Sequence, residues 1–141
     1  MDKIYITWDD FHRDTKRLCD KIKKLGKFDR ILAVSRGGLV PAGIISYEMD
    51  IRNVEAISVS SYDGEVLRDF EDIKVSINVE NVDENTLIID DLSDTGNTFK
   101  LLRSIFPKAK LVSVYVKEAG KPEADAFQEE MPNKWIVFPW D

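Results

Sequence analysis

Short apolar segments that alternate with helical patterns are the feature of this sequence that most limits its fold. Four such segments are mainly apolar and strand-like: 30–34, 54–62, 86–90 and 110–116. Buried parallel strands have this composition, and the helices between them supply the crossover connections. The sequence therefore predicts an α/β fold, a Rossmann-like parallel sheet with helices on both faces.

Three further segments, which alternate with the strand-like ones along the chain, are predicted to be helices. The first, 11–25, carries one apolar stripe. The second, 39–49, has Pro41 in its first turn, where a missing N–H costs little. The third, 98–106, is ended by Pro107. Helices placed in this way fit the right-handed crossovers that a parallel sheet needs.

The first helix carries the only cysteine and the only histidine of the chain. No activating partner of Cys19 is evident, so we interpret it as a small core residue rather than a nucleophile. We expect His12 to occupy a solvated helix position rather than to act as a catalytic base. A single cysteine also excludes an intrachain disulfide and a zinc site built from cysteines.

Composition restricts the classes of function. The 141 residues are a usual length for one domain, which we expect to span 1–141. The net charge of −6 argues against a nucleic-acid partner, because that work needs a basic face. No apolar run approaches the roughly 18 residues of a membrane span, and no signal-peptide core is evident. We expect a cytoplasmic protein, and leave open a peripheral association with the inner membrane through aromatic residues near Trp140.

Two unusual loops, 35–38 and 90–98, each follow a predicted strand. In open parallel sheets, ligands bind beyond the carboxyl ends of the strands, so both loops should face one crevice. The turn 94–98 lies before a helix N-terminus, where backbone N–H groups and the helix dipole attract anions. Gly96 permits close approach of a ligand. A phosphate site is one interpretation of this turn, and a plain helix cap is equally compatible with it.

Asp90 and Asp91 favour a phosphate site over a plain helix cap, and they indicate what kind of phosphate ligand binds there. Carboxylates beside a phosphate repel its negative charge. They are acceptable there if they bind ribose hydroxyls or a Mg²⁺ that the ligand brings. The loop therefore indicates a sugar phosphate with a metal, rather than surface acids near a helix start. Arg36 and Gly37 in the first loop offer a second anion cradle, or alternatively a mere turn. The sequence motifs of a P-loop nucleotide hydrolase and of a phosphatase with an aspartyl nucleophile are both absent.

Residues 87–99 read LIIDDLSDTGNTF. This segment resembles the signature for phosphoribosyl diphosphate (PRPP) of the type I phosphoribosyltransferases. Further segments are similar, in order and spacing, to the bacterial xanthine-guanine phosphoribosyltransferases: KIYITWDDF, AVSRGGLVPAG, SSYD, VKEAGKP and WIVFPWD. The resemblance implies transfer of ribose 5-phosphate from Mg-PRPP to N9 of a 6-oxopurine (xanthine, guanine or hypoxanthine). The products would be a nucleoside monophosphate and pyrophosphate, as in purine salvage.

The resemblance also implies a fold and an assembly. The fold would be that of a type I phosphoribosyltransferase, with a small hood formed by about 117–141 and the N-terminal segment. A mobile loop would span about 63–85. The protein would be a homo-oligomer, a dimer or a tetramer.

Residue roles follow from the same resemblance. The PRPP-binding residues would be Arg36, Gly37, Arg68, Asp90, Asp91, Leu92, Ser93, Asp94, Thr95, Gly96, Asn97 and Thr98, with Asp91 nearest to Mg²⁺. Asp94 would also be catalytic and would accept the N7 proton of the base. Lys117 would donate to the purine O6, Trp135 would stack on the ring, and Ile136 would offer backbone groups to the 2-position.

One region departs from the family pattern. Acids outnumber bases across 63–85, and this stretch is longer than the family's loop. The role of Arg68 in diphosphate binding is therefore an open expectation. The part 73–79 is compatible with a hairpin arm.

Two other functions compete with the purine enzyme. One is a regulatory domain of the same fold that binds PRPP or a nucleotide without turnover, and the other is the same chemistry on orotate. The short acidic chain, which keeps both Asp94 and Lys117, argues against the regulator. The tail WIVFPWD favours a purine.

Overall fold

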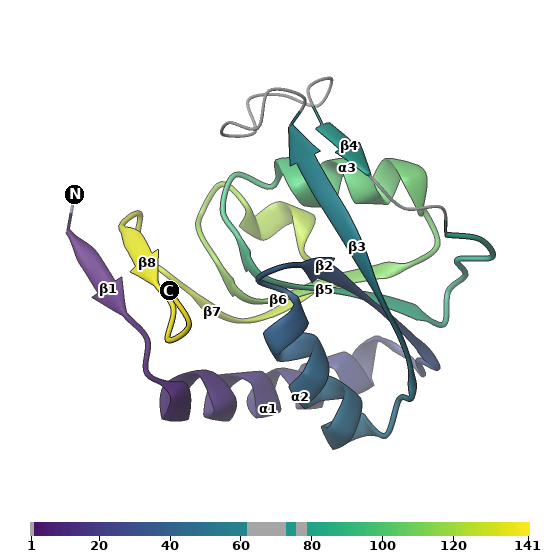
Figure 1. Cartoon of the computed structure of the whole chain (residues 1–141), viewed down its shortest axis with the longest axis horizontal. Helices are drawn as coiled ribbons and strands as arrows, with labels where there is room; N and C mark the ends of the chain where they lie inside the picture. Colours follow the sequence, from purple (N-terminus) through teal and green to yellow (C-terminus); the bar gives the residue numbers. More distant parts are fainter. Residues whose placement is uncertain (1, 62–72, 76–78) are drawn as a thin grey trace.

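The structure is a computed structural model of the whole chain and describes residues 2–61, 73–75 and 79–141 (Figure 1). Its helices and strands follow in the order β1 (Lys3–Tyr5), α1 (Trp8–Leu25), β2 (Arg30–Ser35), α2 (Leu39–Met49), β3 (Asn53–Ser61), β4 (Ile73–Val75), β5 (Thr86–Ser93), α3 (Asn97–Ile105), β6 (Lys110–Val116), a short 3₁₀ helix (Lys121–Glu123), β7 (Ala126–Glu130) and β8 (Trp135–Val137).

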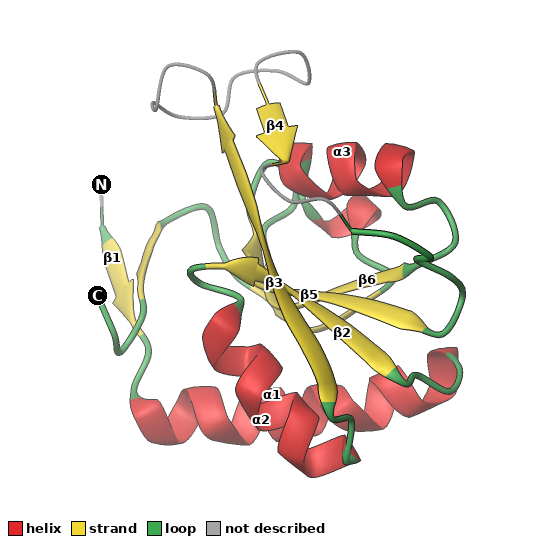
Figure 2. Cartoon of the chain, turned by 45° about the vertical axis from the view of Figure 1, so that its right-hand side comes forward, coloured by secondary structure: helices red, strands yellow, loops and turns green. Residues whose placement is uncertain are grey.

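Six strands form the central sheet in the order β4-β3-β2-β5-β6-β7 (Figure 2). All neighbours pair in parallel except β4, which runs antiparallel to β3. The predicted α/β fold with a parallel sheet is therefore confirmed, with one antiparallel edge strand added. The first part of the expected hairpin arm, 73–75, is that strand, and 76–78 lie outside the described residues.

Helices cover both faces of the sheet, as the sequence predicts. Alternate residues of a strand point to opposite faces. In β2, Ile31 and Ala33 join the core cluster under α1 and α2, whereas Leu32 and Val34 join the cluster under α3. Figure 2 shows α1 and α2 on one side of the sheet and α3 on the other.

A second, two-stranded sheet joins the two ends of the chain. Strand β1 pairs in parallel with β8, so that Lys3 lies opposite Trp135 and Ile4 opposite Ile136. Helix α1 begins directly after β1, and the side chain of Thr7 caps it by accepting from the backbone N–H of Asp10 at 3.0 Å. The sequence analysis found neither this small sheet nor β7, because only long-range pairing defines them.

Cys19 and His12 of α1 both occupy the positions expected for them, Cys19 in the core and His12 in solvent. Cys19 is buried in the core, and burial raises the pKa of its thiol to about 11, so it is no ready nucleophile. His12 is exposed on the outer face of the helix. None of the helices within the described residues is both long and apolar enough to cross a membrane.

Candidate active site

The two loops that the sequence singles out meet at the carboxyl end of the sheet. The first follows β2. The second, predicted as a loop over 90–98, is loop only at 94–96, because β5 continues to Ser93 and α3 begins at Asn97; β2 and β5 are hydrogen-bonded neighbours. A Cβ atom placed on Gly37 would overlap the carboxylate of Asp91, so the first loop lies directly against the second. The prediction that both loops face one crevice is confirmed. Three adjoining cavities occupy this edge.

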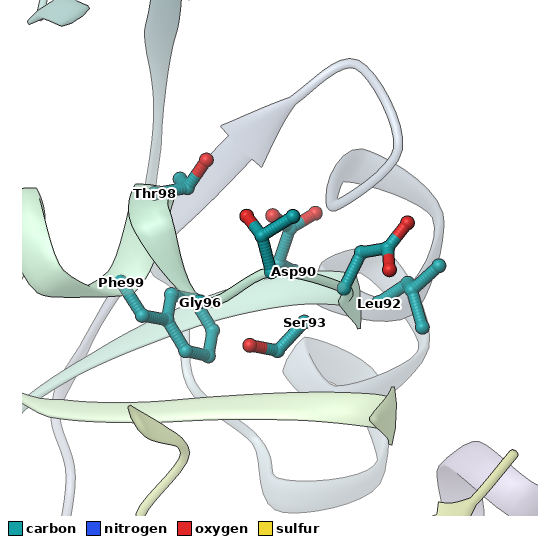
Figure 3. Close-up of a pocket in the computed structure, with 8 residues that line it drawn as sticks. Asp90, Leu92, Ser93, Gly96, Thr98 and Phe99 are labelled. Atoms are coloured by element: carbon teal, nitrogen blue, oxygen red, sulfur yellow. The ribbon is translucent and has the colours of Figure 1, made fainter. Parts of the chain in front are cut away.

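The first, which we term the α3 cavity, has a volume of about 250 Å³. Its lining is one nearly continuous stretch: Asp90, Leu92, Ser93, Asp94, Thr95, Gly96, Thr98 and Phe99 (Figure 3). Gly96 has φ of +88°, a left-handed conformation that suits glycine, and it leads into the first turn of α3. The positive end of the helix dipole therefore faces the cavity, which suits a phosphate.

The second, the lysine cavity, also measures about 250 Å³ and is assembled from separate segments: Asp91, Leu92, Asp94, Lys117, Trp135, Ile136, Phe138 and Asp141. Lys117 is only 7% exposed, and its Nζ donates to Oδ2 of Asp94 at 3.5 Å. Trp135 is 60% exposed and forms an open wall. Asp94 and Leu92 line both this cavity and the α3 cavity.

Close contacts between the end of β5 and the turn after β6 place Lys117 beside Asp94. The backbone N–H of Lys117 donates to the carbonyl of Ser93 at 3.0 Å, and Oγ of Ser93 donates to the carbonyl of Gly120 at 2.9 Å. A Cβ atom on Gly120 would overlap the backbone carbonyl of Ser93. Glycine at 120 is therefore what lets these segments approach.

The third, the arginine cavity, is the largest at about 720 Å³, and Arg36, Gly37, Leu39, Val40, Asp91, Trp140 and Asp141 line it. The peptide bond between Ser35 and Arg36 is cis, and the Arg36 side chain is exposed. Asp91 and Asp141 line both this cavity and the lysine cavity. Neighbouring cavities thus share walls, with Asp94 between the first two and Asp91 between the last two.

Carboxylates are crowded where the cavities join. Burial raises the pKa of Asp90 well above its ordinary value, and the charge of Asp91 raises it further. Burial is also the largest cause of the raised pKa of Asp91, to which the charge of Asp141 adds. Such a group of acids favours a cationic partner.

The donor set fits Mg²⁺ brought by a ligand rather than a metal held by protein alone. Among the residues that the structure describes, no three His, Cys, Asp or Glu side chains form a metal-binding group by themselves. Mg²⁺ is usually bound by one or two carboxylates together with water and substrate phosphates. Asp91 and Asp141, on the shared border of two cavities, supply hard oxygen ligands of that kind.

The structure brings together nearly all of the residues that the sequence singles out. Asn97 begins α3, next to the α3 cavity, and Arg68 lies outside the described residues. Sequence reasoning missed Phe138, Trp140 and Asp141, all of which line a cavity. Their signal was the segment WIVFPWD, in which only the first two residues were assigned roles.

Comparison with known proteins gives consistent results. The phosphoribosyl transferase domain family matches residues 6–141. A xanthine-guanine phosphoribosyltransferase of Idiomarina loihiensis is 42% identical over 140 residues, which cover 99% of this chain and 87% of that one. The enzyme of the same name from Nitratidesulfovibrio vulgaris is 44% identical over 137 residues, covering 96% and 83%. The solved purine phosphoribosyltransferase of Pyrococcus horikoshii superposes with a TM-score of 0.82 at 30% identity, covering 100% of this chain and 95% of that one.

Proposed function

The chain belongs to the phosphoribosyl transferase domain family, and from that premise we propose that it transfers ribose 5-phosphate from PRPP to N9 of a 6-oxopurine. The products are a nucleoside monophosphate and pyrophosphate, and the role is purine salvage. The observation that carries the proposal is the pairing of the buried Lys117 with Asp94 in a cavity that adjoins a phosphate-type helix start.

PRPP occupies the α3 and arginine cavities in this proposal. The 5-phosphate lies at the turn 94–98, where the start of α3 supplies N–H groups and a favourable dipole. Asp90 and Asp91 accept from the ribose hydroxyls. Arg36, with Arg68 as a further contact, binds the diphosphate through charge-assisted hydrogen bonds. Asp91 and Asp141 would hold a Mg²⁺ that arrives with PRPP, and such an ion would supply positive charge beside the diphosphate.

The purine occupies the lysine cavity. The ammonium of Lys117 has donors and no acceptor, so it matches a 6-oxo group and not a 6-amino group. The exposed ring of Trp135 stacks on the base, and the backbone of Ile136 meets its 2-position. This arrangement places the base beside Asp94, which also borders the α3 cavity.

Asp94 is the catalytic residue of the proposal. Its carboxylate accepts the N7 proton as N9 attacks C1 of the ribose, and that hydrogen bond strengthens as N7 grows more acidic. The neighbouring carboxylates stabilise positive charge that develops at C1. A regulatory domain that binds PRPP or a nucleotide without turnover does not require a proton acceptor, so the contact between Asp94 and Lys117 favours an enzyme.

Pyrophosphate release tests the proposal. The chain is incubated with PRPP, Mg²⁺ and each of xanthine, guanine, hypoxanthine, adenine and orotate. We expect release with the 6-oxopurines and little with adenine or orotate. PRPP binding without release on any base would favour the regulatory alternative, and release with orotate alone would overturn the purine assignment.

The assembly and location are proposed from the family pattern alone. We propose a homo-oligomer, a dimer or a tetramer, in the cytoplasm. Light scattering at assay concentration measures the assembly directly, and a monomeric mass for the active protein would contradict it.

A further inference from the structure

A cluster of aromatic rings packs behind the lysine cavity. Phe11 of α1 lies edge-on to Phe138 and Trp140, with ring centroids 6.1 and 4.9 Å apart. Phe138 stacks on Trp140 at 4.7 Å, and Tyr115 of β6 lies 6.1 Å from Phe138. Phe138 lines the lysine cavity and Trp140 the arginine cavity, whereas Phe11 and Tyr115 are fully buried behind them.

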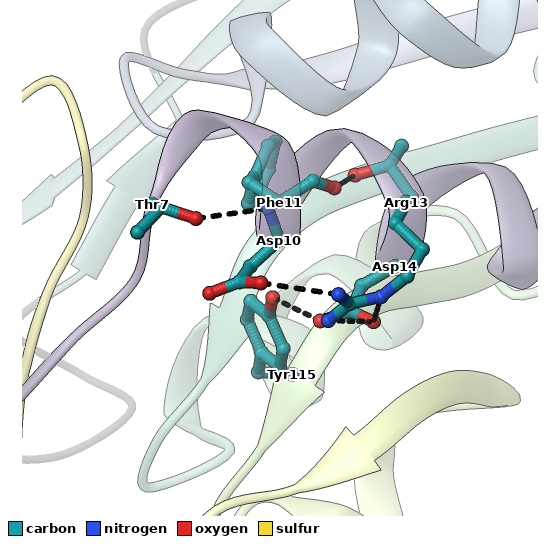
Figure 4. Close-up of polar contacts among 7 residues, drawn as sticks. Thr7, Asp10, Phe11, Arg13, Asp14 and Tyr115 are labelled. Atoms are coloured by element: carbon teal, nitrogen blue, oxygen red, sulfur yellow. Dashed lines mark hydrogen bonds and ion pairs between the residues drawn. The ribbon is translucent and has the colours of Figure 1, made fainter.

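A buried hydrogen bond fixes the innermost ring of this cluster. The hydroxyl of Tyr115 donates to Oδ2 of Asp14 at 2.6 Å, which joins β6 to α1 (Figure 4). Tyr115 is 1% exposed and Asp14 is 6% exposed. Burial and the neighbouring carboxylate both raise the pKa of Tyr115, so the phenol stays protonated and remains the donor.

Arg13, an exposed residue of α1, orients the carboxylate of Asp14. The Nε and Nη2 atoms of Arg13 lie 3.4 Å from its Oδ1, and Nη1 of Arg13 contacts Asp10 at 3.1 Å. Oδ1 of Asp14 therefore faces Arg13, while Oδ2 is left to accept from Tyr115. These contacts give the Tyr115 ring one preferred position.

Tyr115 is connected to the base site in two ways. It lies near the end of β6, two residues before Lys117 in the chain. Its ring also contacts Phe138, a wall of the lysine cavity. The α3 cavity meets this cluster through Leu92, which lies opposite Tyr115 in the sheet, whereas Phe99 at its wall belongs to the core cluster on the opposite face of the sheet.

We propose that Asp14 and Tyr115 are positioning residues for the purine base, which act by holding Lys117 and Phe138 in place. This inference rests on the proposed function. A buried phenol or carboxylate that loses its partner is costly, so the pair confines both groups to one arrangement. Small displacements of a positioning group are enough to change reaction rates strongly. The effect should be larger for the base than for PRPP, because Tyr115 contacts Phe138 of the lysine cavity directly, whereas the PRPP cavities meet the cluster at their borders, through Leu92 and Trp140.

Substitution of Tyr115→Phe keeps the ring and removes the hydrogen bond. We expect the KM for guanine to rise by roughly fivefold to tenfold, because Lys117 and Phe138 are no longer held in one position, while the KM for PRPP stays within about twofold. Asp14→Asn keeps an oxygen acceptor for the Tyr115 hydroxyl and should retain nearly wild-type values for both substrates. Asp14→Leu should reproduce the effect of Tyr115→Phe.

A double variant keeps the test decisive if a single variant folds poorly. Tyr115→Phe combined with Asp14→Leu removes both polar groups of the pair, so neither is left buried without its partner. The double variant should therefore fold, and the guanine KM should remain raised by about the same factor. Ser46→Ala is the matched control: it removes a 2.7 Å hydrogen bond to the carbonyl of Ile51, at residues that line none of the three cavities. It should change neither KM.

The outcomes separate this inference from the function on which it rests. A wild-type chain that releases no pyrophosphate with any purine shows that the proposed function has failed. If the wild type is active, a double variant with an unchanged guanine KM overturns the positioning role. Equal rises in both KM values, in either Tyr115→Phe or the double variant, also overturn it, because they indicate a general structural defect.

Discussion

The α3 cavity and the lysine cavity adjoin one another, yet they are built in opposite ways. The α3 cavity comes from a single connection, the end of β5 and the start of α3, and lies within residues 90–99. The lysine cavity needs the end of β5, the turn after β6 and the tail from β8 onward. The first is a local structure, whereas the second exists only when distant segments have docked.

The two cavities also differ in what maintains their shape. The α3 cavity depends on backbone features, namely the left-handed Gly96 and the N-terminus of α3. The lysine cavity depends on side-chain packing, with Lys117 buried beside Asp94 and aromatic rings behind Phe138. Changes in the two regions should therefore affect different substrates, whereas a residue on their border can act on the reaction that joins the two substrates.

Asp94 lies on that border, so its substitution should have the largest effect. Asp94→Asn preserves the shape of the side chain but removes the base that accepts the N7 proton. We predict that kcat falls by roughly 10²–10⁴, the usual range for positioned acid–base help, while PRPP binding stays nearly intact. Steady-state rates and calorimetry of PRPP binding measure the two quantities. Wild-type turnover of guanine and xanthine by Asp94→Asn would reduce Asp94 to a part of the phosphate turn.

Gly37 tests the PRPP side of the comparison. A Cβ atom at this position overlaps the carboxylate of Asp91, so Gly37→Ala should displace a group that binds ribose or metal. Since a shift of about 1 Å can cost on the order of 10²-fold, we predict that kcat/KM for PRPP falls by about that factor. Initial rates at varied PRPP concentration measure it.

Gly43 offers a matched control in the following helix. A Cβ atom on Gly43 meets nothing within 4 Å, so Gly43→Ala should retain full activity. It should also raise the free energy of unfolding by about 0.5–1 kcal/mol, because alanine suits a helix interior better than glycine. Equal losses of activity in Gly37→Ala and Gly43→Ala would show that the close approach to Asp91 has no functional importance.

Lys117 tests the base side, with the smallest of the three effects. Lys117→Met retains the length of the side chain and removes its donors. We predict a loss on the order of tenfold in kcat/KM for guanine, reduced discrimination against adenine and an unchanged KM for PRPP. Competition assays between guanine and adenine measure the selectivity. Unchanged selectivity would mean that another group contacts O6.

The same contrast explains which parts were predictable from sequence. Periodicity revealed β2, β3, β5 and β6 and the three helices, and the acids and Gly96 revealed the α3 cavity, because both signals are local. Trp140 and Asp141 belong to the segment WIVFPWD, which carries the family resemblance, but nothing local in that segment shows that they line a cavity. Nothing in the apolar segment 110–116 indicates that Tyr115 forms a hydrogen bond, because its partner Asp14 is 101 positions away in the chain. Only the fold brings such residues together.

A crystal structure of the chain with guanosine monophosphate and Mg²⁺ tests the central claim most directly. The claim is that one continuous site holds the phosphate in the α3 cavity and the purine in the lysine cavity. The account predicts the 5-phosphate at the turn 94–98, the O6 atom within hydrogen-bond distance of Lys117 Nζ, and N7 beside Asp94. A nucleotide with its base in the arginine cavity, or bound away from the 94–98 turn, would contradict it.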